Sequence, residues 1–127
     1  MSYIGQSLKR REDERLLLGG RSYVGDVWRP GALHAAVLRS PHAHARILRL
    51  ETGAARRAPG VLEVLTYKDA PERARPIPMR MSERETMNRF LQRPLADGKV
   101  RYAGEPVAVV LAESRYLAED ALELIEV

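Results

Sequence analysis

Three histidines and a serine come nearest, by type and spacing, to a reactive site in this sequence: His34, Ser40, His42 and His44. Imidazole nitrogens are good zinc ligands, but a zinc site takes at least three protein ligands. His42 and His44 share one face of an extended segment. If the chain reverses at Pro41, His34 lies roughly 20 Å from the turn, so the three imidazoles do not converge. We therefore predict no metal site.

Ser40 and His42 also suggest a nucleophile paired with a base. An imidazole that acts as a base is normally oriented by a third group such as a carboxylate, and no Asp or Glu lies near these residues in the sequence. No nucleophile elbow surrounds Ser40, and the chain contains no glycine-rich phosphate-binding motif. We expect no catalytic, cofactor-binding or metal-ligating residue in this sequence.

The composition indicates one small domain with an aliphatic core. Hydrophobic residues make up 45% of the 127 positions and aromatic residues only 6%, so the core must be built from Leu, Val, Ile and Ala. The 21 basic and 17 acidic side chains give a net charge of +4, and the two signs are interleaved. That pattern is typical of a solvated surface.

Six arginines gather between residues 73 and 93, in the least periodic part of the chain. Such cations are what phosphate contacts need. Glutamates interrupt the run, however, and only Phe90 is available to stack on a base. We interpret this arginine-rich loop as a solvated or partner-facing surface, and we expect no nucleic-acid partner.

The sequence contains no cysteine, so the chain forms no disulfide and holds no cysteine-ligated zinc or iron–sulfur cluster. Its first residues lack the apolar stretch of a signal peptide. No apolar run reaches the length of a membrane span. These features favour a cytoplasmic protein without a membrane span.

Hydrophobic periodicity and turn residues predict a compact α+β unit. The predicted elements are a helical turn at 14–18, strands at 32–39 and 45–50, a helix at 52–58, strands at 61–66, 99–102 and 106–112, and a helix at 114–127. The run at 106–112 is continuously apolar, which predicts a strand covered on both faces. Between 67 and 98 we predict a long surface loop with one short helix near 83–91.

The predicted last helix begins at Ser114, a good N-cap residue, and carries an apolar stripe. It ends without the glycine or the basic last turn that commonly closes a helix. Its last residues include Glu123 and Glu126, which oppose the helix dipole. The chain therefore looks cut, and we expect it to be a fragment of a longer polypeptide.

Four stretches resemble the N-terminal part of the molybdenum-binding large subunit of the xanthine dehydrogenase, aldehyde oxidase and aerobic carbon monoxide dehydrogenase family. They are GQSLKRREDERLLLGGRSYVGDV at 5–27, PGALHAAVLRSPHAHARI at 30–47, APGVLEVLT at 58–66 and PLADGKVRYAGEPVAVVLAESRYLAEDALELIEV at 94–127. Their order and spacing agree with the family. The segments RSPHAHARI and VRYAGEPVAVV are the most specific.

The resemblance implies that residues 1–127 are a single α/β hammerhead domain, an α+β fold with a small mixed sheet and two or three helices. In such a subunit this structural domain precedes a molybdopterin-binding region, which is absent here. The parent enzyme would oxidise an aldehyde, an N-heterocycle or carbon monoxide with oxygen from water. It would use molybdopterin with Mo, and its partner subunits or domains would carry FAD and [2Fe–2S] clusters. The resemblance places no catalytic or cofactor-binding residue in this chain.

A contact with the molybdopterin-binding region is nevertheless expected at the turn that contains Arg39, Ser40, His42 and His44, because loops on rigid scaffolds often carry function. A purely structural turn is the competing interpretation. The alternative for the whole chain is a free-standing protein-interaction module that works through the arginine-rich loop. In either case an exposed apolar surface could make the isolated fragment dimerise without biological meaning.

Overall fold

The structure, a computed structural model, describes residues 3–20, 23–27, 29–69, 75–78, 86 and 90–127. The chain divides into two compact units, Met1–Ala32 and Leu33–Val127. The first unit contains one short helix, α1 (Asp13–Leu17), and one 3-10 turn, η1 (Val24–Asp26). Helix α1 lies one residue before the predicted helical turn and buries no side chain.

The second unit is built on a three-stranded antiparallel sheet. Its strand order is β1-β5-β3, with bounds β1 (His34–Arg39), β3 (Val61–Thr66) and β5 (Pro106–Ala112). A second, two-stranded antiparallel sheet pairs β2 (Ala45–Arg46) with β4 (Lys99–Val100). The remaining elements are α2 (Gly53–Arg56), the 3-10 turn η2 (Tyr67–Asp69) and α3 (Arg115–Leu122). The predicted α+β class is confirmed.

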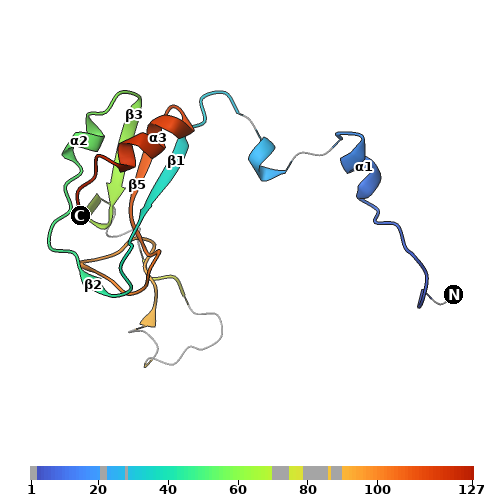
Figure 1. The fold of residues 1–127 in the computed structure, drawn as a ribbon, viewed down its shortest axis with the longest axis horizontal. Coiled ribbons are helices and arrows are strands. Elements are labelled where there is room, and N and C mark those ends of the chain that lie inside the picture. Colours follow the sequence, from blue (N-terminus) through green and yellow to red (C-terminus); the bar gives the residue numbers. More distant parts are fainter. Residues whose placement is uncertain (1–2, 21–22, 28, 70–74, 79–85, 87–89) are drawn as a thin grey trace. The chain divides into compact units, whose positions relative to one another are not determined.

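Strand β5 lies at the centre of the main sheet, as its continuous apolar run predicts. Helix α3 packs across this sheet and contacts all three of its strands (Figure 1). The core between α3 and the sheet consists largely of alanine and valine: Ala36, Ala55, Val64, Ala108, Val110, Ala112, Ala118, Ala121 and Ile125. A smaller cluster of Ala96, Val100 and Val107 lies under the two-stranded sheet. The prediction of an aliphatic core is confirmed.

The start of α3 follows the sequence prediction. The hydroxyl of Ser114 accepts a hydrogen bond from the amide of Leu117 at 3.3 Å, which satisfies one of the free N–H groups of the first turn. The end of α3 does not follow it. The helix stops at Leu122, and the chain then forms a turn and pairs in an antiparallel bridge between Glu126 and Glu51. The predicted helix over 114–127 is therefore too long at its carboxyl end.

The bridge is made by two backbone hydrogen bonds, from the Glu51 amide to Glu126 at 2.9 Å and from the Glu126 amide to Glu51 at 3.2 Å. The guanidinium of Arg49 lies 3.2 Å from the Glu51 carboxylate and 3.7 Å from that of Glu126. Ile125, just before the bridge, is buried in the core. Burying Ile125 and pairing Glu126 with Glu51 stabilises the chain end more than a longer helix would, because acidic residues at the end of a helix oppose its dipole.

Two predicted strands are also shorter than expected. Strand β2 covers only the first two residues of 45–50, because its partner β4 has only two residues with which to pair. Strand β4 ends at Val100, because the amide of Arg101 donates to the carboxylate of Glu105 rather than to a neighbouring strand. Most of the helix predicted near 83–91 lies outside the described residues.

Gly60, in the turn between α2 and β3, has a φ of +72°. A Cβ added here would lie 2.5 Å from Cδ1 of Leu117, on the adjacent helix α3. Gly98 has a similar φ of +65° but nothing within 4 Å of the added atom. We therefore expect Gly60→Ala to lower the free energy of unfolding by about 2 kcal/mol and Gly98→Ala by about 1 kcal/mol. Urea unfolding of both variants measures the difference, and equal losses would show that Leu117 moves aside without cost.

Candidate interaction site

The turn that follows β1, residues 39–44, is held by the side chain of Ser40. Its Oγ accepts a hydrogen bond from the His42 amide at 3.0 Å and donates one to the His42 carbonyl at 3.0 Å. Ser40 itself is buried. A hydroxyl that is both donor and acceptor within two residues replaces the pairing that Pro41 denies to the backbone. This segment is called the Ser40 turn below.

The Ser40 turn is fixed to a second turn that lies 65 residues further along the chain. The Ser40 amide donates to the Glu105 carbonyl at 3.0 Å, and the Gly104 amide donates to the Ser40 carbonyl at 2.8 Å. The Arg39 guanidinium donates to the Gly104 carbonyl at 2.9 Å. Three bonds between the two turns leave the Ser40 turn little freedom to move.

Glu105 anchors the second turn from inside. Its side chain is only 2% exposed, and its carboxylate accepts a hydrogen bond from the Arg101 amide. The Arg101 guanidinium lies 3.5 Å from the other carboxylate oxygen. A buried carboxylate is costly unless it is paired in this way. The sequence does not predict the role of Glu105. The contacts of Glu105 with Arg101 depend on how the turn folds, and no local sequence pattern indicates that this acid is buried.

The structure separates the three histidines as the sequence argument predicted. His34 is the first residue of β1, while His42 and His44 lie beyond its last residue, and all three side chains are exposed. Within the described residues, no group of three or more His, Asp or Glu side chains could hold a metal ion.

The Ser40 turn borders a hollow of about 140 Å³. Arg39, Ser40 and His42 line it, whereas His44 does not. Its other lining residues are mostly apolar: Leu38, Pro41, Ala45, Arg46, Ile47, Val100, Val107 and Val127. Three of the four residues predicted as contacts thus meet at one hollow with aliphatic walls.

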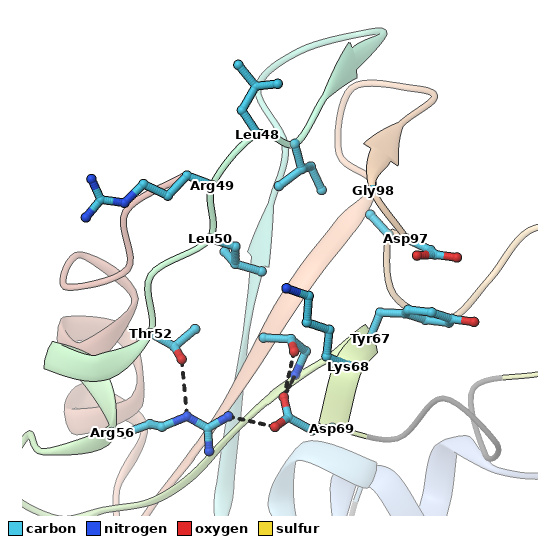
Figure 2. A pocket seen from close by; sticks show the side chains of 13 residues that line it. Leu48, Arg49, Leu50, Thr52, Arg56, Tyr67, Lys68, Asp69, Asp97 and Gly98 are labelled. Carbon is cyan, nitrogen blue, oxygen red and sulfur yellow. Dashed lines mark hydrogen bonds and ion pairs between the residues drawn. The ribbon is translucent and has the colours of Figure 1, made fainter.

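A larger hollow of about 300 Å³ lies between residues 47–52, 66–69 and 96–98 (Figure 2). Arg56 is one of the residues that line this hollow. Arg56 donates to the Thr52 hydroxyl at 3.2 Å and to the carboxylates of Glu63 at 2.6 Å and Asp69 at 2.9 Å. These bonds join α2 to β3 and η2. Thr52, the N-cap residue of α2, makes no capping bond with its side chain and bonds Arg56 instead.

Asp69 completes this network. Its second carboxylate oxygen accepts from the amide and the hydroxyl of Thr66, at 2.7 and 2.6 Å. Partial burial raises the pKa of the Asp69 carboxyl, but the bonds from Thr66 and the charge of Arg56 outweigh burial and lower the pKa below its ordinary value. The spacing Thr66-x-x-Asp69 resembles a capping box, but the Thr66 hydroxyl donates to the Asp69 carboxylate rather than accepting from its amide. The network ties α2, β3 and η2 to one another.

The family of this chain is decided by sequence comparison. The family model for the aldehyde oxidase and xanthine dehydrogenase a/b hammerhead domain matches residues 18–127. This chain belongs to that family. The match covers both sheets, α2, α3 and the Ser40 turn, so the hammerhead fold expected from the resemblance is confirmed.

Three relatives show the range of the family. The carbon monoxide dehydrogenase large chain of Afipia carboxidovorans is 42% identical over 98% of this hammerhead chain and 15% of its own length. The structure of quinoline 2-oxidoreductase from Pseudomonas putida 86 is 42% identical, with a TM-score of 0.80 over 98% of this chain and 16% of that one. A Cu,Mo-CO dehydrogenase structure is 38% identical, with a TM-score of 0.75 over 96% of this chain and 15% of that one.

The hammerhead chain spans about a sixth of the length of the curated relatives it matches. The relatives named above include a large chain and an oxidoreductase, and one of the solved enzymes contains molybdenum. Among the helices that the structure describes, none is long and apolar enough to cross a membrane.

Proposed function

We propose that this hammerhead domain is the N-terminal structural domain of a molybdenum hydroxylase large subunit. The parent enzyme would oxidise an aldehyde, an N-heterocycle or carbon monoxide with oxygen derived from water. The identities of 38–42% to a carbon monoxide dehydrogenase large chain, a Cu,Mo-CO dehydrogenase and a quinoline oxidoreductase support this assignment. The catalytic groups would lie in a molybdopterin-binding region beyond residue 127. FAD and [2Fe–2S] clusters would lie on partner subunits or domains, and the enzyme would be cytoplasmic.

The residues of this domain do not fit a metal cofactor. The described part of the chain has no cluster of three potential ligands, and its three histidines lie at opposite ends of β1. We therefore derive no catalytic step from these residues. The role that we assign to them is mechanical: they present a fixed surface to the cofactor-binding region.

The Ser40 turn is the observation that supports this mechanical role. Its backbone is bonded to the turn at 102–105, so its shape is set before any partner arrives. His42 and His44 nevertheless remain exposed, and His42 borders an aliphatic hollow. A preformed turn with free imidazole groups beside apolar walls binds another protein surface at a low cost in conformational entropy.

The test is to introduce His42→Ala into the whole large subunit and to measure the amount of molybdenum bound per subunit. We expect occupancy to fall, to about a third of the wild-type value when the wild type is half loaded, since losing one contact of ~1 kcal/mol changes the equilibrium about fivefold. His34→Ala is the matched control, because His34 is also an exposed histidine of this unit but lies at the far end of β1. Equal molybdenum content in the wild type and in both variants would remove the Ser40 turn from the proposal.

The alternative is a free-standing interaction module that works through the arginine-rich loop. Of its six arginines, only Arg75 and Arg93 lie within the described residues. Arg93 contacts the Tyr67 hydroxyl, lies over the Tyr67 ring and is 3.7 Å from the Asp97 carboxylate. An arginine engaged inside its own domain is a poor docking group, so we favour the Ser40 turn.

A further inference from the structure

The residues before the hammerhead core form a segment with no core of its own. Every described side chain of the unit Met1–Ala32 is exposed or half-buried, and α1 buries none. Residues 3–27 are called the arm below. Most large apolar side chains in the arm are 57% to 93% exposed, among them Tyr3, Leu8, Leu17, Leu18, Tyr23, Val24 and Val27; Leu16 is half-buried.

So much exposed apolar surface on so short a segment marks an interaction site. A five-residue helix such as α1 is unstable alone, because isolated helices shorter than about 12–15 residues are marginal in water. Burial of each large aliphatic side chain contributes about 1.5–3 kcal/mol. The arm therefore gains most of its stability from a surface that it covers.

Part of the charge near α1 is already paired within the arm. Arg10 lies 3.6 Å from the Glu12 carboxylate and 3.3 Å from that of Asp13, so these groups satisfy one another within the arm. Leu17 and Leu18, at the other end of the helix, are 86% and 78% exposed. Val24, in η1, is 93% exposed.

The comparisons show that the arm aligns with much longer proteins. The family model begins at Leu18, but the curated relatives align with 98–99% of this chain, so their match continues through the arm. These relatives are about six times longer than the chain. A partner surface on the same polypeptide is also favoured physically, because tethering gives the arm a high effective concentration near it.

We propose that the arm docks, through Leu17, Leu18 and Val24, on an apolar surface of the polypeptide that follows residue 127 in the same large subunit. The inference rests on the proposed function, because it needs that longer subunit. The occupant is thus a later region of the same chain. The hammerhead core, a second copy and another subunit are the alternatives that the experiment must exclude.

The first experiment places a photoreactive amino acid, p-benzoylphenylalanine, at position 17 of the whole large subunit. Cross-linked peptides are then mapped by mass spectrometry, with the same replacement at Leu48, also strongly exposed but outside the arm, as reference. We expect the position-17 product to join the arm to residues beyond 127 of the same subunit. Cross-links to residues 33–127, to a second copy or to another subunit would overturn the proposal, as would the absence of any product.

The second experiment measures how fast trypsin cuts at Lys9, Arg11 and Arg15. In the whole subunit we expect cutting about tenfold slower than in a synthetic peptide of residues 3–27, because a docked segment must open before it is cleaved. The double variant Leu17→Ser with Leu18→Ser should restore the peptide rate, and Leu48→Ser should not. Equal rates in the wild-type subunit and the peptide would contradict docking.

The molybdenum content of the wild-type subunit separates the two proposals. A subunit that contains molybdenum but cross-links its arm elsewhere would refute only the docking of the arm. A subunit without molybdenum whose arm still cross-links beyond residue 127 would refute only the proposed function.

Discussion

Replacing Glu105 with alanine is expected to lower the free energy of unfolding of the hammerhead unit by about 3 kcal/mol. The change removes the acceptor of the Arg101 amide and leaves a space where a side chain that is 2% exposed had been. It also loosens the turn that binds Ser40, because the Glu105 carbonyl and Gly104 belong to the same turn. Urea unfolding, monitored by circular dichroism, measures the loss.

Glu105→Gln is the matched control. The amide oxygen of glutamine can still accept from the Arg101 amide and fills nearly the same space, so we expect a loss of about 1 kcal/mol. Only the attraction between the carboxylate and the Arg101 guanidinium is removed. If the alanine and glutamine variants lost the same stability, the charge rather than the hydrogen bond and the packing would be the main contribution of Glu105.

Enlarging Ala118 to leucine is expected to cost about 3 kcal/mol, because overpacking a filled core forces side chains and backbone out of their preferred positions. Ala118 is fully buried on the face of α3 that meets the sheet. Ala36, Ala108 and Ala112 belong to the same cluster. Small side chains on both surfaces let the helix and the sheet approach closely, and no space is left for three added carbons.

Asp120→Leu places the same leucine side chain on the exposed face of α3 and serves as the control. We expect its stability to remain within about 0.5 kcal/mol of the wild type. Thermal unfolding of both variants, monitored by circular dichroism, gives the comparison. A small effect of Ala118→Leu would mean that α3 shifts away from the sheet easily, and the close approach would then have no energetic consequence.

The parts of the fold that sequence reasoning predicted are those that local patterns encode. The continuous apolar run at 106–112 gave a central strand, and Ser114 gave the cap of α3. The turn glycine at 60 carries the positive φ that such a position requires. Each signal is contained in fewer than ten neighbouring residues, so one sequence is enough to identify it.

The errors concern contacts between residues far apart in the chain. The end of α3 is set by pairing between Glu126 and Glu51, and periodicity within the helix carries no information about that pairing. Likewise, β4 ends where the Arg101 amide donates to the Glu105 carboxylate instead of to a carbonyl of a neighbouring strand. Local propensity cannot decide between such alternatives, because tertiary contacts override it.

For the site, the sequence predicts which residues form the turn but not the hydrogen bonds that hold the turn in place. Ser40 and His42 were singled out from the segment 39–47, and the Ser40 turn does border a hollow with Arg39 and His42 in its wall. Its attachment to Gly104 and Glu105 follows only from the antiparallel pairing of β1 with β5. The bonds between Thr66 and Asp69 likewise join residues only three apart, yet nothing in the sequence shows that Asp69 also pairs with Arg56.

The Arg49 bridge between Glu51 and Glu126 has a consequence for the solvent conditions that the domain tolerates. Two like charges on paired backbone positions repel each other, and one cation between them attracts both. Dissolved ions screen the repulsion and the attractions together. The two attractions outnumber the single repulsion, so added salt is expected to weaken this closure of the chain.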